Sequence, residues 1–272
     1  MPANPSPYEI DIEDIILKRL GRWSWCVPRF LLHRLRDFIH QDFINTYLRQ
    51  GRQGVDFCTG TMEYLGVSIS VEGRENLPHD GRSYIFASNH PLGAIDGVAL
   101  GSVLGQEYDG EIVYLVNDLL MNLRGLAPLC VPTNKIGRQS RESSRLIAQA
   151  FQGKRHAILF PAGLCSRLQD DGKVSDPPWK KSFIHLSRQH RRDVVPIHFI
   201  AQNSPRFYRV ARWCKRLHLP NLAMALLPDE MYRAQGSHFT LRIGKPIPWQ
   251  TFDNSQTPLQ WAERVKDTVY KL

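Results

Sequence analysis

The stretch IFASNHPLGAIDG, residues 85–97, joins an apolar run to a segment rich in small residues and contains a histidine and an aspartate. The apolar run is typical of a buried strand, and the segment that follows is typical of a helix. His90 and Asp96 are therefore expected between a strand and a helix, where ligand sites form in open α/β sheets. Pro91 disfavours helical backbone at His90, and Gly93 gives the turn its freedom.

The spacing of His90 and Asp96 restricts how the two side chains can meet. On one helix they would point to different faces, because six steps of about 100° turn through about 600°. They can pair only if His90 lies in the turn and Asp96 in or near the first turn of the helix. Asp96 would then hold one imidazole nitrogen and leave the other as a general base. The alternative is a capping Asp96 and a His90 that fills a turn position.

The composition is that of a globular protein with a basic surface. Hydrophobic residues make up 42% of the 272 residues and charged residues 22%, which excludes a disordered chain. The formal charge of +9 suits anionic lipid headgroups, nucleic acid or an acidic carrier protein. No basic motif interleaved with aromatic residues is present, so nucleic acid is not an expected partner. The five cysteines form no CxxC pair and the ten histidines show no ligand spacing, so we expect reduced thiols and no metal site.

Strand-like and helix-like segments alternate from residue 67 onward, which predicts an α/β fold with a mostly parallel central sheet flanked by helices. We divide the chain into an N-terminal helical segment, residues 1–65, and an α/β domain, residues 66–272. The expected strands are 67–71, 84–88, 111–116, 156–160, 193–200 and 239–244. The expected helices of the α/β domain are 97–104, 140–151, 179–189, 206–217, 221–234 and one that begins at Thr257-Pro258.

The N-terminal segment contains an amphipathic pattern after Pro28. Asp11 can cap a first helix that ends at Gly21, and Pro28 is favourable in the first turn of a second. In the second helix one face is basic and the opposite face is apolar, which suits either a bilayer surface or docking on the protein core. The acidic N-terminus is unlike a signal peptide, and no stretch reaches the roughly 18 apolar residues of a membrane span. Any membrane contact is therefore expected to be peripheral. The basic face comprises Arg29, His33, Arg36 and His40, and the apolar face comprises Leu31, Leu32, Leu35, Phe38 and Ile39.

Two further stretches follow in order, AILFPAGLCSR at 157–167 and VVPIHF at 194–199. Together with SNHPLGAIDG they resemble the glycerolipid acyltransferase superfamily, typified by 1-acyl-glycerol-3-phosphate acyltransferases. That family has His-x4-Asp after a strand, then FPEGTRS, then a VVP-type strand. The resemblance covers roughly residues 67–200, and the variant here is most similar to a bacterial subgroup of lysophospholipid acyltransferase-like or hemolysin-like proteins.

The resemblance implies a peripheral membrane O-acyltransferase on the cytoplasmic side of the inner membrane. It implies transfer of a fatty acyl group from a thioester, on acyl carrier protein or coenzyme A, to the hydroxyl of a lysolipid. His90 would be the general base and Asp96 would orient it, while Phe160, Pro161 and Gly163 would line the acceptor site. Membrane lipids and acyl carrier protein are the implied partners. Because the thioester is already activated, no metal or other cofactor is expected. The alternative is a non-catalytic lipid- or carrier-binding protein with the same fold.

Three departures from the family pattern bear on the acceptor. The spacing is His-x5-Asp, and the family's Glu and Arg in FPEGTRS are replaced by Ala162 and Cys165. In the family these two charged residues belong to acceptor binding. Their loss disfavours a glycerol-3-phosphate-type acceptor and favours a lyso-aminolipid such as a lyso-ornithine or lyso-glycine lipid. The remaining basic residues that we consider for acceptor binding are Arg167, Lys135, Arg138 and Lys180.

Overall fold

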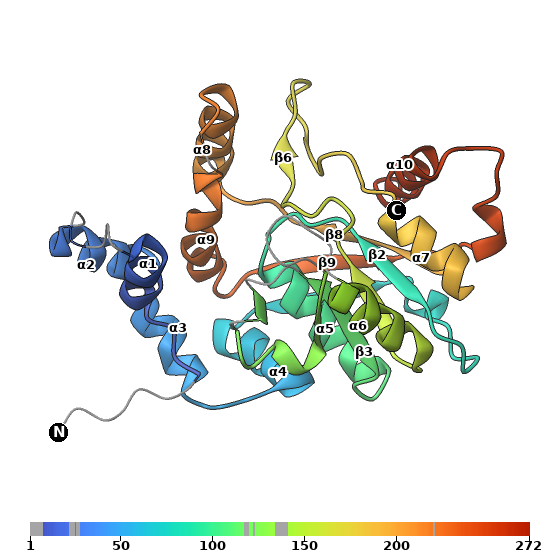
Figure 1. The fold of residues 1–272 in the computed structure, drawn as a ribbon, viewed down its shortest axis with the longest axis horizontal. Coiled ribbons are helices and arrows are strands. Elements are labelled where there is room, and N and C mark those ends of the chain that lie inside the picture. Colours follow the sequence, from blue (N-terminus) through green and yellow to red (C-terminus); the bar gives the residue numbers. More distant parts are fainter. Residues whose placement is uncertain are drawn as a thin grey trace.

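A seven-stranded sheet forms the centre of the computed structural model, which describes residues 8–21, 25, 28–116, 120–121, 123–133, 141–219 and 221–272 (Figure 1). The strands of this sheet are β1 Ser68–Glu72, β2 Ile85–Ser88, β3 Ile112–Val116, β4 Cys130–Pro132, β5 His156–Leu159, β8 Val194–Ile200 and β9 His238–Ile243. They lie in the order β1-β9-β8-β2-β5-β3-β4. Every neighbouring pair is parallel except β8 and β9, so the predicted mostly parallel α/β fold is confirmed.

The central strands are covered on both faces, which explains why their sequences are nearly continuous apolar runs. Along β2 the side chains alternate, so that Phe86 belongs to one core and Ile85 and Ala87 to the other. Two helices cover the face of Phe86, namely α4 Gly54–Leu65 and α5 Ile95–Glu107. Three cover the opposite face, namely α6 Arg141–Gln152, α7 Ser182–His190 and α10 Pro258–Val269. Thr257 and Gln260 form a capping box on α10, where Thr257-Pro258 predicts the start of a helix.

Three short strands were not predicted. They are β4 and the two strands of a small hairpin, β6 Arg167–Leu168 and β7 Val174–Ser175. Runs of two or three residues carry too little periodicity to be recognised. The predicted helix 221–234 is also interrupted, because the 3₁₀ segment η5 Leu222–Leu226 precedes the α-helix α9 Leu227–Arg233. Pro228 lies in the first turn of α9, where its missing N–H is tolerated. Ahead of η5, α8 Pro205–Arg216 matches the predicted helix 206–217.

The N-terminal helices are α1 Ile12–Leu20, α2 Arg29–Phe38 and α3 Gln41–Leu48. Asp11 caps α1 as expected. The prediction that Arg29 and His40 share one helix face is wrong, because α2 ends at Phe38 and His40 adopts a left-handed conformation with φ 54°. The apolar face is divided as well: Leu32 is buried, whereas Leu31 is exposed. Among the described residues, no helix has the length and apolar character needed to cross a membrane.

Candidate active site

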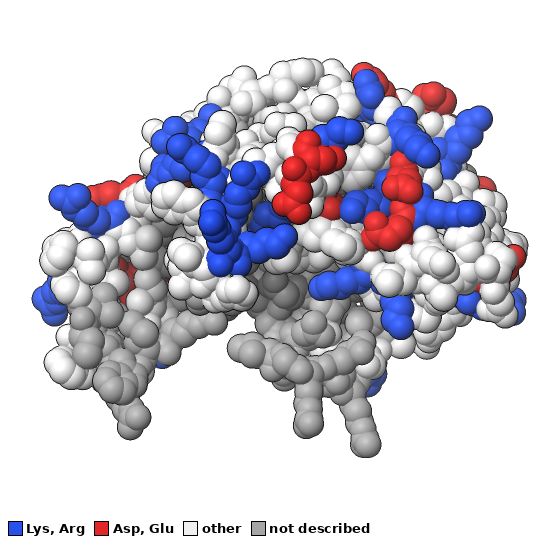
Figure 2. All heavy atoms as spheres, turned by 90° about the horizontal axis from the view of Figure 1, so that it is seen from above, with Lys and Arg blue, Asp and Glu red and all other residues white. Residues whose placement is uncertain are grey.

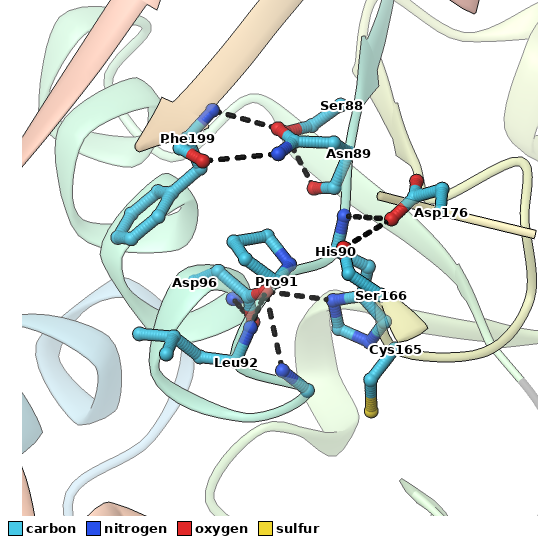
Figure 3. Close-up of polar contacts among 12 residues, drawn as sticks. Ser88, Asn89, His90, Pro91, Leu92, Asp96, Cys165, Ser166, Asp176 and Phe199 are labelled. Carbon is cyan, nitrogen blue, oxygen red and sulfur yellow. Dashed lines mark hydrogen bonds and ion pairs between the residues drawn. The ribbon is translucent and has the colours of Figure 1, made fainter. Parts of the chain in front are cut away.

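His90 and Asp96 meet at the carboxyl end of β2 (Figure 3). His90 Nδ1 lies 3.0 Å from Asp96 Oδ2, and the Asp96 side chain is fully buried in the first turn of α5. The same oxygen accepts the backbone N–H groups of Leu92 at 2.9 Å and Gly93 at 3.2 Å. Asp96 Oδ1 accepts the N–H of Gly97 at 2.9 Å. Asp96 therefore fixes the turn and the imidazole together, but it is not the helix cap of the alternative, because the N-cap of α5 is Ala94.

The contacts of Asp96 define which imidazole nitrogen is available for chemistry. An ionised carboxylate only accepts hydrogen bonds, so in the neutral imidazole the proton lies on His90 Nδ1 and Nε2 keeps its lone pair. The additional residue of the His-x5-Asp spacing is accommodated in the turn, where Gly93 has a φ of 79° that side chains rarely adopt. A Cβ at this glycine would also lie 2.3 Å from Cys165 Sγ. The turn therefore requires glycine for two separate reasons.

The two groups favour a carboxylate beside an imidazolium. Burial lowers the pKa of His90, but the adjacent Asp96 carboxylate and the nearby Asp176 carboxylate raise it, and the net shift is upward. Burial raises the pKa of Asp96, but His90 and the backbone N–H groups lower it, and the net shift is downward. The site is thus arranged to stabilise the positive charge that His90 acquires when it accepts a proton.

Four further predicted site residues lie together at the turn that follows β5, and one of them, Phe160, contacts His90. The Phe160 ring stacks on the imidazole with centroids 4.1 Å apart, directly after the end of β5. Lys180 donates its backbone N–H to Pro161 O at 3.0 Å. A Cβ at Gly163 would lie 2.6 Å from Lys180 Nζ, so the lysine side chain passes over a glycine with φ 69°. Lys135 and Arg138 lie outside the described residues.

Arg167 is held by the protein itself. Its guanidinium donates to Cys165 O at 2.8 Å and to Asn221 Oδ1 at 3.3 Å, and it lies 5.2 Å from the centroid of the Phe207 ring. Cys165 and Ala162, which replace the charged residues of the family motif, are each only 4% exposed. Neither position is exposed enough for a solvated charge, and among the described residues Lys180 is the cation that lies over the Phe160–Gly163 turn.

An apolar cavity of about 180 Å³ begins at His90 and Phe160. Its wall is almost entirely hydrocarbon and aromatic, and it extends between α3, α4 and the start of α5. A larger and more polar cavity of about 610 Å³ lies between α6 and α7 and also includes Phe160 and Lys180. The two cavities meet at the turn that follows β5. The apolar cavity is lined by Ile44, Tyr47, Leu48, Phe57, Thr61, Leu65, Val98, Tyr114, Leu126 and Met231, among others.

Four buried polar residues that hold the active-site loop were not identified from the sequence. Asn89 pairs through its side-chain amide with both backbone groups of Phe199, at 2.9 Å and 2.7 Å. Asn203 donates to Pro91 O at 3.1 Å. Asp176 and Ser166 contact the backbone of His90. Only Asn89 and Ser166 stand within recognisable motifs; the other two are distant in sequence and carry no local signal.

The site thus combines a histidine paired with a buried carboxylate and an apolar cavity next to them. Residues 17–272 match the family described as Acyltransferase, and the chain belongs to this family. It is an acyltransferase, which confirms the predicted superfamily. The alternative of a non-catalytic binding protein is therefore not supported. Within the described residues, no group of three or more His, Cys, Asp or Glu is placed to hold a metal ion.

The most informative relatives are two curated bacterial enzymes. The chain is 52% identical over 273 residues to a lyso-glycine lipid O-acyltransferase of Bacteroides thetaiotaomicron, covering 99% of this chain and 100% of the relative. It is 50% identical over 273 residues to the enzyme with the same name in Phocaeicola vulgatus, covering 99% and 97%. The crystal structure of the 1-acyl-sn-glycerophosphate acyltransferase PlsC of Thermotoga maritima shares the fold, with a TM-score of 0.50, 16% identity and coverage of 96% and 94%.

Proposed function

We propose that this acyltransferase transfers a fatty acyl group from a thioester to the hydroxyl of a lyso-glycine lipid, with His90 as general base. The observation that carries the proposal is the imidazole whose Nδ1 is held by a buried carboxylate and whose ring opens onto an apolar cavity. The two relatives are named lyso-glycine lipid O-acyltransferases, which supports this class of acceptor.

The proposed reaction uses His90 twice. Nε2 takes the proton of the acceptor hydroxyl as its oxygen attacks the thioester carbonyl, and the imidazolium is stabilised by Asp96. When the tetrahedral intermediate collapses, the C–S bond breaks and the imidazolium returns the proton to the leaving thiolate. One ester forms, one thioester is consumed, and His90 ends in its starting state. A position beside a buried carboxylate suits both halves of this cycle, because the charge is required only transiently.

The apolar cavity fits the acyl chain of the donor. Its wall offers contacts to hydrocarbon and few hydrogen-bonding groups, which is the environment that a fatty acyl chain prefers. Because the cavity begins at His90, an acyl chain inside it would present its thioester carbonyl to the imidazole. The carrier, acyl carrier protein or coenzyme A, would then remain outside the cavity.

The acceptor side favours a headgroup with a single carboxylate. A phosphomonoester prefers several charge-assisted donors, preferably from arginine, whereas Ala162 and Cys165 are buried and Arg167 is already bound. Lys180 supplies one cation beside the Phe160–Gly163 turn. A glycine headgroup offers one carboxylate and no phosphate, which suits the cations of the described residues.

Contact with the bilayer is proposed to be peripheral and to involve α2. Trp25, Phe30 and Leu31 are exposed at and just before the start of this helix, while Leu32 packs inward. Exposed aromatic and aliphatic side chains with arginines on the same helix suit shallow insertion among lipid headgroups.

The decisive experiment is a competition between acceptors. Purified protein receives a long-chain acyl carrier protein with equal concentrations of lysophosphatidic acid and lyso-glycine lipid, and the products are separated by mass spectrometry. We expect lyso-glycine lipid to be consumed first by a clear margin in kcat/KM. Preferential consumption of lysophosphatidic acid would refute the acceptor assignment, and consumption of neither would refute the thioester donor or the class of acceptor.

A further inference from the structure

The helix α8 and the segment η5 form a surface with exposed apolar side chains. Their inner sides pack toward the active-site region, because Phe207, Ala211 and Ala223 belong to one buried cluster with Cys165. In Figure 1, α8 stands above α9 and away from the sheet. Trp213 is 67% exposed and Leu217 63% exposed. We define the α8–η5 surface by its exposed large apolar residues, which are Trp213, Leu217, Leu219, Leu222 and Met224.

The same surface is strongly basic. Lysine and arginine side chains gather over α8 in Figure 2, and the sequence of this helix contains no acidic residue. Arg206 is paired with Asp229, but no ion pair of the described residues involves the four other basic residues of α8. Uncompensated cations beside exposed aromatic and aliphatic groups match an interface with anionic lipid headgroups above hydrocarbon. The four residues are Arg209, Arg212, Lys215 and Arg216.

We propose that the α8–η5 surface is a second bilayer contact that delivers the lipid acceptor to the active site; the delivery rests on the proposed function. The surface is linked directly to that site, because Arg167 contacts both Phe207 in α8 and Asn221 next to η5. An acidic partner would account for the cations only, whereas hydrocarbon beneath anionic headgroups accounts for the five large exposed apolar side chains as well. A tryptophan beside arginines is the composition expected at the boundary between headgroups and hydrocarbon.

The test removes the apolar groups and leaves the charges. The triple variant Trp213→Ser/Leu217→Ser/Leu222→Ser is compared with the matched control Leu259→Ser, since Leu259 is 52% exposed on α10. Both are measured by flotation with vesicles that contain phosphatidylglycerol, and by acyl transfer to lysolipid in vesicles and to a short-chain soluble lysolipid. We expect the triple variant to lose at least about tenfold in vesicle binding and in kcat/KM on vesicles, but not on soluble lysolipid.

The outcomes distinguish a failure of the proposed bilayer contact from a failure of the proposed reaction. Wild-type vesicle binding by the triple variant would overturn the proposed bilayer contact. A triple variant that lost binding to acyl carrier protein but kept binding to vesicles would overturn it as well. Flotation does not depend on turnover, so a failure of the proposed acceptor or base leaves this measurement valid. A soluble-substrate rate that falls as much as the vesicle rate would assign the effect to the active site and also overturn the proposal.

A second observation concerns the backbone of His90, which is clamped on both sides. Asp176, only 1% exposed, accepts the His90 N–H at 3.2 Å and the Ser166 hydroxyl at 2.6 Å on the same oxygen (Figure 3). Ser166 donates its own N–H to His90 O at 2.8 Å. The other Asp176 oxygen accepts Trp179 Nε1 at 2.9 Å. These contacts form a closed network around the peptide groups of His90.

The network places a second negative charge near the imidazole. Burial raises the pKa of Asp176, the hydrogen bonds from Ser166, Trp179 and His90 lower it, and the net shift is upward. Because all three partners can donate, the carboxylate form fits the arrangement. Its charge raises the pKa of His90 together with the larger effect of Asp96, whereas burial and the Arg167 guanidinium lower it.

We infer that Asp176 is a positioning residue that holds His90 through its backbone and stabilises the imidazolium during acyl transfer; the inference rests on His90 as the base. The test compares Asp176→Asn with Asp170→Asn, which removes a charge from the nearby exposed turn of the β6–β7 hairpin. Without the Asp176 charge the pKa of His90 falls, so the unprotonated base persists to lower pH. The acidic limb of the kcat/KM profile should move to lower pH in Asp176→Asn and stay in place in Asp170→Asn.

A further variant separates charge from geometry. Ser166→Ala removes a hydrogen bond to Asp176 but keeps the carboxylate, so we expect kcat to fall by about tenfold while the acidic limb stays at its wild-type pH. An unmoved limb in Asp176→Asn, or a wild-type kcat in Ser166→Ala, would overturn the inference. Full activity of His90→Ala would instead refute the proposed function, and the two failures are thereby distinguished.

Discussion

Replacing Asp96 with asparagine tests the arrangement of the active site with a nearly isosteric change. All four partners of the Asp96 carboxylate are donors: the His90 imidazole and three backbone N–H groups. Asparagine has only one side-chain acceptor oxygen. If that oxygen faces His90, Leu92 and Gly93, the amide NH₂ opposes the N–H of Gly97. If the amide is reversed, its NH₂ faces the imidazole, and His90 must accept at Nδ1 and carry its proton on Nε2.

The expected losses of stability and of kcat/KM follow from these two orientations of the amide. Either orientation leaves at least one N–H without its acceptor in a buried or partly buried place, which costs about 1–3 kcal/mol in the free energy of unfolding. In the reversed orientation Nε2 cannot accept the substrate proton, and in both the imidazolium loses its carboxylate. Loss of general-base catalysis of this kind corresponds to about 10²–10⁴-fold in kcat/KM, or about 2.7–5.4 kcal/mol in the activation free energy.

The assay measures kcat/KM for acyl transfer together with the free energy of unfolding in urea. The matched control is Asp193→Asn, because Asp193 is also a buried carboxylate that accepts a backbone N–H, from Trp249 at 2.9 Å, but lies outside the active site. We expect both variants to lose stability and only Asp96→Asn to lose activity by at least about a hundredfold. An Asp96→Asn enzyme within threefold of the wild-type kcat/KM would refute the proposed role of the pair.

Four further outcomes follow from the same structure. His90→Ala should lower kcat/KM by about 10²–10⁴-fold with the fold retained, as measured by turnover and circular dichroism. The wild-type rate should fall as pH drops through a His90 pKa that lies above the ordinary value, because imidazolium cannot accept the substrate proton. Val98→Phe narrows the apolar cavity and should shift the preferred donor toward shorter acyl chains in a chain-length series, at a stability cost of about 1–3 kcal/mol. Phe30→Ser/Leu31→Ser should reduce flotation with anionic vesicles. Unchanged binding would show that α2 does not contact the bilayer.

Much of the sheet could be predicted because each central strand is a short apolar run bounded by turn residues. The runs that form β2, β5 and β8 were each placed within about one residue of their observed bounds. The order of these strands and the antiparallel direction of β9 were not predicted, since neighbours in the sheet are distant in the chain. The short strands β6 and β7 were missed, because pairing with each other defines them and periodicity does not.

The sequence alone determined the α/β class, the motif that contains His90 and Asp96, and the absence of charge at Ala162 and Cys165, because these are properties of residue type and local order. Only the tertiary structure decided that Asp96 serves both as the partner of the imidazole and as the acceptor of the turn, since the spacing permits either role. It also decided that Asp176 lies at the backbone of His90, although 86 residues separate them. Such a contact is made by the packing of a hairpin against the end of a strand, and no pattern in the intervening chain records it.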